Sequence, residues 1–148
     1  MGDYTLRSVD TDQSSVLVID DDPAQAAVIM KMLQGGRYAF TICNDADNAL
    51  VLLNGPQGFD LIFCASMLPG FSVLQMVEYL RRTKGGENTP IIMMGTHGGG
   101  SEVGDDAKDA GANAFIAKPF TTFELRIAVD LVMATSAQPA LIIVDRLI

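Results

Sequence analysis

The stretch Val16-Leu-Val-Ile-Asp-Asp-Asp-Pro23 joins a short apolar run to three acids and a proline. An apolar run of this length favours a buried β-strand. Pro23 suits the first turn of a helix, because the N–H that proline lacks would be unpaired there anyway. The apolar residues that follow recur at helical spacing: Ala26, Ala27, Met30 and Leu33. The stretch therefore predicts a strand that leads directly into a helix.

The same alternation continues along the chain. Four further apolar runs lie at 39–43, 61–64, 91–94 and 114–117. Helical patterns lie between these runs at 46–53, at 72–80 and, more weakly, at 101–110. A further helical pattern follows the last run at 121–134. Two of these helices begin with the spacing of a capping box, Ser72 to Gln75 and Thr121 to Glu124. Strands that are apolar on both faces and alternate with helices predict a doubly wound α/β fold with five parallel strands.

A chain of 148 residues is expected to form one domain. We expect a polar N-terminal extension at 1–14, the domain itself at 15–134, and an apolar tail at 135–148. The tail is too apolar for a solvated terminus. It is expected to pack as an extra strand on this domain or to act as a dimerisation element on a second copy.

Composition excludes several classes of function. The net charge of -8, without a local cluster of Lys or Arg, predicts that the chain does not bind nucleic acid. No apolar run approaches the roughly 18 residues that span a bilayer, and no secretory leader is evident, so we expect a cytoplasmic protein that does not enter membranes. Cys43 and Cys64 lie in apolar runs and are expected to be buried thiols, without a disulfide or metal.

Charged side chains follow the first and last predicted strands. Asp20, Asp21 and Asp22 could hold a hard cation such as Mg²⁺ through carboxylate oxygens, or could simply favour the start of a helix. Lys118, before Pro119, follows the fifth strand. Because the carboxyl ends of parallel strands share one edge of a sheet, Lys118 is expected to lie near these carboxylates.

These features together resemble the receiver domain of two-component response regulators, over residues 15–134. The segment Phe59-Asp-Leu-Ile-Phe-Cys-Ala-Ser-Met-Leu-Pro-Gly70 looks like the family's third strand and following loop, and Gly111-Ala-Asn-Ala-Phe-Ile-Ala-Lys-Pro-Phe120 looks like its end. The resemblance implies a flavodoxin-like (βα)5 fold. It also implies that Asp20 and Asp21 correspond to the family's magnesium-binding acids and Lys118 to its lysine.

Two positions depart from the family's pattern. Ala65 stands where the family has its phosphorylated aspartate, and Gly95 stands where it has a Thr or Ser. Phe115 takes the place of the aromatic switch residue, where we favour a core role. The resemblance therefore implies a degenerate pseudo-receiver with no catalytic residue, no cofactor, and weak or absent Mg²⁺ binding.

Three other candidates are weaker. Ser66 is expected to face away from Ala65, and Asp60 lies at the other end of the strand, so neither replaces the missing acid. His97 is interpreted as a solvated loop residue. The glycines at 98–100 lack the Lys-Ser/Thr ending of a phosphate-binding loop and are interpreted as a flexible segment.

Three hypotheses for function follow. The leading one is a phosphorylation-independent signalling module that binds a protein, such as a sensor kinase or another signalling protein, through its fourth helix, fifth strand and fifth helix. The alternative is a dimeric scaffold assembled through the apolar tail. A remote third is a metal-dependent enzyme of phosphoryl transfer or hydrolysis, for which no nucleophile or third ligand is evident.

Overall fold

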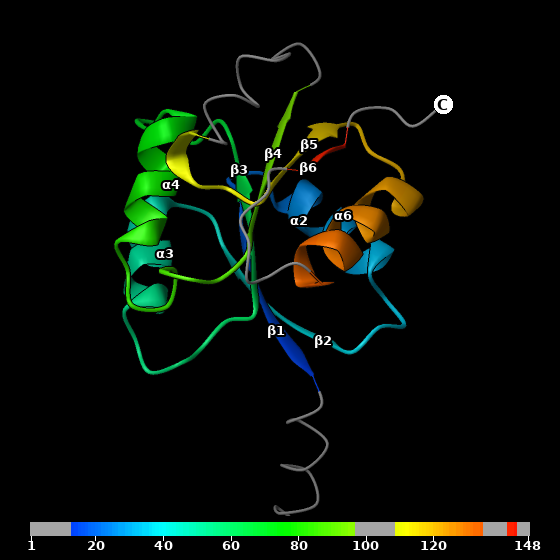
Figure 1. Ribbon diagram of the computed structural model, residues 1–148, viewed down its shortest axis with the longest axis horizontal. Helices are drawn as coiled ribbons and strands as arrows, with labels where there is room; N and C mark the ends of the chain where they lie inside the picture. Colours follow the sequence, from blue (N-terminus) through cyan, green and yellow to red (C-terminus); the bar gives the residue numbers. More distant parts are fainter. Residues whose placement is uncertain (1–12, 97–108, 135–141, 145–148) are drawn as a thin grey trace, which may run out of the picture.

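A computed structural model describes residues 13–96, 109–134 and 142–144. Within them lies a six-stranded parallel sheet with helices on both faces (Figure 1). The elements in chain order are β1 (Ser14–Ile19), α2 (Pro23–Met32), β2 (Tyr38–Cys43), α3 (Ala46–Leu53), β3 (Leu61–Ala65), α4 (Val73–Arg81), β4 (Ile91–Thr96), β5 (Ala114–Lys118), α6 (Thr122–Ala134) and β6 (Ile142–Val144).

The strand order is β2-β1-β3-β4-β5-β6. The first five strands confirm the predicted doubly wound parallel sheet, and each is one or two residues longer than the predicted run. The largest extensions, of two residues, are at the start of β1 and at the end of β4, which continues through Gly95 to Thr96. Of the weak helix predicted at 101–110, only Asp109 and Ala110 are described, and both are helical. His97 and the glycines at 98–100 lie outside the described residues.

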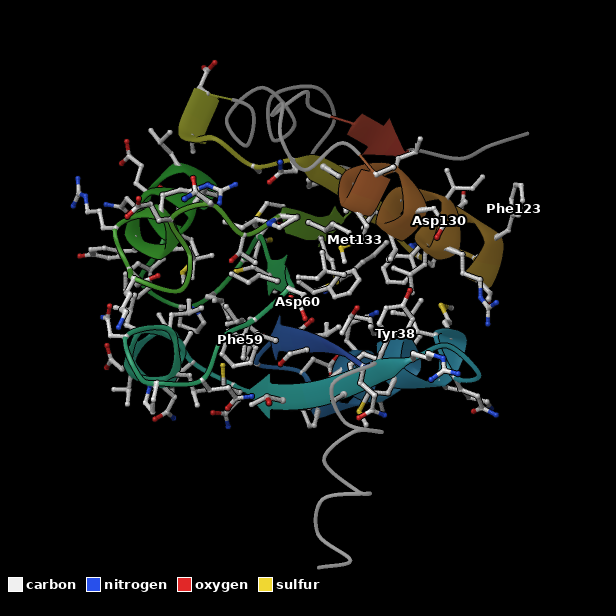
Figure 2. All side chains as sticks on the ribbon, turned by 60° about the horizontal axis from the view of Figure 1, so that its bottom comes forward. Tyr38, Phe59, Asp60, Phe123, Asp130 and Met133 are labelled. Atoms are coloured by element: carbon white, nitrogen blue, oxygen red, sulfur yellow. The ribbon has the colours of Figure 1, made fainter. Side chains whose placement is uncertain are left out.

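A separate apolar core lies on each face of the sheet, between the strands and the helices that cover that face. Residues such as Ile19, Ile62 and Met93 pack with α3 and α4, whereas Val18, Phe63 and others pack with α2 and α6. Figure 2 shows the two sides through Phe59, which belongs to the first core, and Tyr38 and Met133, which border the second. Alternating side chains on strands buried on both faces explain why the apolar runs of the sequence are continuous.

The helix starts follow local chemistry. Asp22 caps α2 by accepting from the backbone N–H of Ala24, and Pro23 occupies the first turn. Ser72 and Gln75 form the predicted capping box of α4, with the Gln75 N–H 3.1 Å from the Ser72 hydroxyl. Thr121 and Glu124 do the same at α6. None of the described helices is both long and apolar enough to cross a bilayer.

The two ends of the domain have different structures. Ser14, which we assigned to the N-terminal extension, is the first residue of β1. In the C-terminal tail, residues 142–144 form β6, which pairs with β5 in parallel and in the register Ala114↔Ile142 to Ile116↔Val144. The other residues of both terminal segments, apart from Gln13, lie outside the described parts of the chain.

Arg81, the last residue of α4, ties together the amino-terminal edge of the sheet. Its guanidinium donates to the carbonyls of Gly111, Gly86 and Thr89 and to the Asn113 side chain, at 2.6–3.2 Å. These groups belong to the segments that lead into β4 and β5. One cation therefore binds carbonyl groups of two loops and holds them together.

We expect Arg81→Met to lower the free energy of unfolding by about 2–4 kcal/mol, because several partly buried carbonyl oxygens would lose charge-assisted hydrogen bonds. Urea unfolding followed by circular dichroism measures the change. The neighbouring Arg82 is exposed, so Arg82→Met is the matched control and should change stability by less than about 0.5 kcal/mol. Equal effects of the two substitutions would contradict the role given to Arg81.

Cys43 and Cys64 are free and buried, as predicted. Both are register partners of Ile19, one on each side of β1. Two strand spacings separate them by about 9–10 Å, beyond the roughly 7 Å that a disulfide spans. Burial raises the pKa of Cys43 to about 11, with a further contribution from Asp45. Burial also raises the pKa of Cys64, with smaller contributions from Cys43 and Asp20.

Raised thiol pKa values predict a stability that depends on pH. Unfolded thiols ionise near their ordinary pKa while folded ones stay protonated, so the free energy of unfolding should fall as pH rises from about 9 towards 11. Urea titrations at several pH values, compared with a Cys43→Ala/Cys64→Ala chain, isolate this contribution. The same slope in both chains would refute it.

Candidate functional site

The candidate site lies at the carboxyl edge of the sheet, where parallel strands end together. Asp20 directly follows β1, Ala65 ends β3, Gly95 lies next to the end of β4, and Lys118 ends β5. The fold therefore brings the ends of four neighbouring strands to one edge, although the residues come from distant parts of the sequence.

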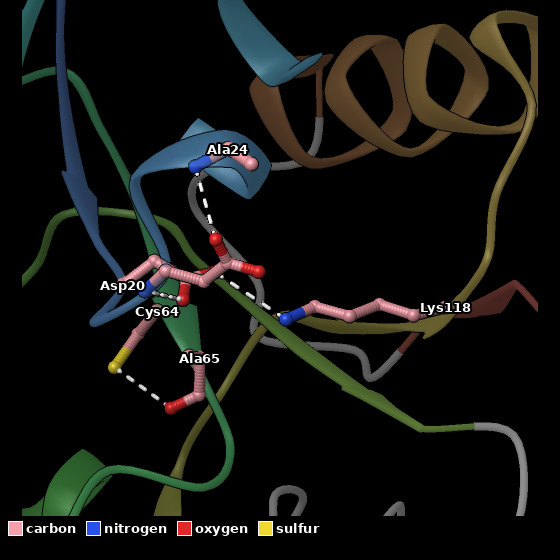
Figure 3. Close-up of polar contacts among 6 residues, drawn as sticks. Asp20, Ala24, Cys64, Ala65 and Lys118 are labelled. Atoms are coloured by element: carbon pink, nitrogen blue, oxygen red, sulfur yellow. Dashed lines mark hydrogen bonds and ion pairs between the residues drawn. The ribbon is translucent and has the colours of Figure 1, made fainter. Parts of the chain in front are cut away.

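Asp20 is the charged centre of this edge. It is only 1% exposed, and its Oδ2 accepts from Lys118 Nζ at 3.3 Å (Figure 3). Its Oδ1 accepts from the backbone N–H of Asp22 at 2.9 Å. A buried carboxylate is tolerated only when it is paired and hydrogen-bonded, and here each oxygen has a partner. The predicted proximity of Asp20 and Lys118 is confirmed.

The other two acids lie at the surface. Asp21 and Asp22 are both exposed, and one Asp22 oxygen accepts from the N–H of Ala24 at 3.0 Å. No three His, Cys, Asp or Glu side chains within the described ranges are grouped so that they could hold a metal ion. The residues present thus do not fit a magnesium site: Lys118 engages Asp20, and β3 supplies no carboxylate. Weak or absent Mg²⁺ binding stays a prediction.

Ala65 closes the end of β3 with a methyl group. It is 4% exposed and belongs to the core beneath α3 and α4. A methyl group has no lone pair with which to attack a phosphoryl donor. Asp60 lies at the other end of the strand, where its carboxylate accepts from the N–H of Ser15 at 2.7 Å. This acid is therefore remote from Ala65.

Gly95 is enclosed by its neighbours. A Cβ atom added at this position would lie 2.5 Å from the Ser66 hydroxyl oxygen and 2.9 Å from two ring carbons of Phe115. Both side chains are buried, and the Phe115 ring belongs to the core, as we favoured from its apolar position. Ser66 and Phe115 thus fill the space that a side chain at position 95 would need. The missing hydroxyl is evident from the sequence, whereas this packing depends on contacts between distant segments.

We expect Gly95→Ala to lower the free energy of unfolding by about 1–3 kcal/mol, because a methyl group would overpack a filled core. Adding Phe115→Leu should make the combined loss smaller than the sum of the two single losses, since the shorter side chain frees space. Chemical unfolding of the four chains measures this coupling. Gly58→Ala, where an added Cβ meets nothing within 4 Å, is the control. A Gly95→Ala chain as stable as the natural one would disprove the packing argument.

Known proteins share the sequence pattern of this chain. The family model described as "Response regulator receiver domain" matches residues 16–130. The phosphate regulon transcriptional regulatory protein PhoB of Escherichia coli is 30% identical over 118 residues, which cover 80% of this chain and 51% of that protein. The chain thus spans about half the length of this curated relative.

Two solved structures show the same fold. The chemotaxis response regulator CheY4 of Vibrio cholerae superposes with a TM-score of 0.72 at 25% identity, over 81% of this chain and 98% of that one. The receiver domain of the sensor histidine kinase PA1611 of Pseudomonas aeruginosa, with a magnesium ion in its active-site cleft, gives 0.71 at 25% identity, over 83% and 99%. The chain therefore belongs to the response regulator receiver domain family, the signalling module of two-component systems.

Proposed function

We propose that this receiver domain works without aspartyl phosphorylation and acts by binding another protein, such as a sensor kinase or another signalling protein. The observation that carries the proposal is Ala65, which places a methyl group at the end of β3. The resemblance to receiver domains assigns this position to the phosphorylated aspartate. The chemistry of that step needs a carboxylate oxygen as nucleophile.

The charge balance of the pocket supports the same conclusion. The PA1611 receiver holds a magnesium ion in its active-site cleft. In this chain, Lys118 already neutralises the buried Asp20 carboxylate. The pair stabilises the pocket without a metal, so we assign it a structural role that positions the loops after β1 and β5.

Gly95, at the position where the family has a Thr or Ser, supports the proposal independently. Gly95 has no group that could bond a phosphoryl oxygen, and Phe115 is packed against it. A change of state that moved Phe115 would open a cavity in the core, at a cost of roughly 24 cal/mol per Å³ of empty volume. We therefore propose that the pocket keeps one conformation.

We place the protein-binding surface on α6 and beside it. Phe123, near the start of this helix, is 66% exposed and points away from the body of the domain (Figure 2). Aromatic side chains of this kind are enriched at protein interfaces. The edge of β5, which we included in the predicted surface, is covered by β6. The fourth helix predicted for that surface lies almost entirely outside the described residues.

The proposal predicts the outcome of incubation with acetyl phosphate and Mg²⁺, followed by intact mass measurement. The natural chain should gain no phosphoryl group. Ala65→Asp should gain one, because the restored carboxylate is the nucleophile that the natural chain lacks, and Asp20 and Lys118 remain in place at the same edge of the sheet.

The matched control is Ala65→Asn, which has nearly the shape of aspartate but no nucleophilic carboxylate and should remain unmodified. A phosphoryl group on the natural chain would contradict the proposal. Repeating the reaction with Ser66→Ala would then show whether the buried hydroxyl next to Gly95 had taken it.

A further inference from the structure

The short strand β6 reaches its place by an unusual route. It continues the sheet beyond β5, and the chain arrives there through α6. A strand–helix–strand connection between parallel strands is either right-handed or left-handed. The handedness depends on the direction of the step along the sheet and on the face that the helix covers. The strand order gives the direction, and the two apolar cores give the face.

Three connections agree with one another. The steps from β2 to β3 and from β3 to β4 go in the same direction along the sheet, and α3 and α4 cover the same face. The step from β1 to β2 goes in the opposite direction with α2 on the opposite face, which is the same hand after a half-turn of the molecule.

The last connection differs. The step from β5 to β6 goes in the direction of the step from β3 to β4, but α6 packs on the face of α2 (Figure 1). The β5–α6–β6 connection therefore has the hand opposite to the other three. Such connections are right-handed in about 98% of cases, because twisted strands and helices pack back onto a sheet more readily in that sense.

The backbone pairing between β5 and β6 does not require that α6 of the same chain connects the two strands. Its register, Ala114↔Ile142 to Ile116↔Val144, involves only the two strands. The same backbone pairs form when β6 comes from another chain, and the unfavourable hand then disappears. Without β6, β5 would present an open strand edge, which readily pairs with another chain.

We propose that β6 on the edge of β5 is exchanged between two copies of this chain. Each copy gives its β6 to the other and receives one in return, so the contact closes as a two-fold dimer. Seven residues, 135–141, connect Ala134 to Ile142, and a segment of this length can extend over about 25 Å. The exchange does not depend on whether the pocket is phosphorylated, and its failure would leave the proposed function unaffected.

Disulfide trapping in full-length chains tests the exchange. Ala114 and Ile142 are direct register partners, and neighbouring strands lie within the Cα separation that a disulfide spans. One chain carries Ala114→Cys and a second carries Ile142→Cys; the two are mixed, unfolded and refolded together, and oxidised. We expect a disulfide-linked pair of chains that contains one of each. The natural chain, whose two thiols are buried, is the control and should stay unlinked.

The opposite result is equally clear. A chain that carries both substitutions and links only within itself, together with no cross-link in the mixture, would show that β6 stays on its own domain. Absence of any disulfide in either sample would show that β6 does not pair with β5. Either result overturns the proposal.

Light scattering of intact chains gives a second test. The natural chain should have twice the mass of one copy, and Ile142→Asp/Ile143→Asp should halve that mass, since aspartate is poorly tolerated in strands. Leu147→Asp/Ile148→Asp adds the same charge outside β6 and should leave the mass unchanged. A single-copy mass for the natural chain, or a dimer that survives the change in β6, would refute the exchange.

Discussion

The burial of one carboxylate constrains the whole carboxyl edge of the sheet. Asp20 is almost completely removed from solvent at the end of β1, and an ion in that position must be compensated within the protein. Lys118, 98 residues further along the chain, and the N–H of Asp22 provide the compensation. The pair therefore links the first strand of the domain to the fifth and also fixes the start of α2. This requirement holds whether or not the pocket ever receives phosphate.

A comparable arrangement serves the opposite edge of the sheet. There Arg81 carries the charge, and its partners are carbonyl and amide oxygens instead of a carboxylate. No buried side-chain nitrogen or oxygen in the described parts of the chain lacks a hydrogen-bond partner. The two apolar cores thus lie between two polar edges, and each edge is organised by a single long cationic side chain.

Much of this architecture could be predicted from the sequence. The apolar runs located the strands, because strands buried on both faces leave a continuous pattern. The capping spacings located the starts of α4 and α6, since those contacts join residues only three positions apart. Asp20 and Lys118 could be paired because both directly follow strands of a parallel sheet, and Ala65 could be placed by counting back from Pro69.

The remainder depends on contacts between distant segments. Arg81 donates mainly to backbone carbonyls. Every residue has a backbone carbonyl, so the sequence does not indicate which ones Arg81 will contact. The enclosure of Gly95 depends on the rotamers of Ser66 and Phe115, which belong to two other segments. The apolar tail indicated that it packs on something, but the hand of its connection follows only from the face on which α6 lies.

The packing around Gly95 also limits how the pocket can be changed. A variant with a carboxylate at position 65 would still lack a hydroxyl at position 95, and the first added carbon there meets Ser66 and Phe115. A smaller residue is needed at position 66 or 115 before a side chain with a hydroxyl fits at position 95. Until that side chain is present, the smaller residue leaves a cavity in the core. The order of the two changes is thereby constrained, because the neighbour must become smaller before a side chain fits at position 95.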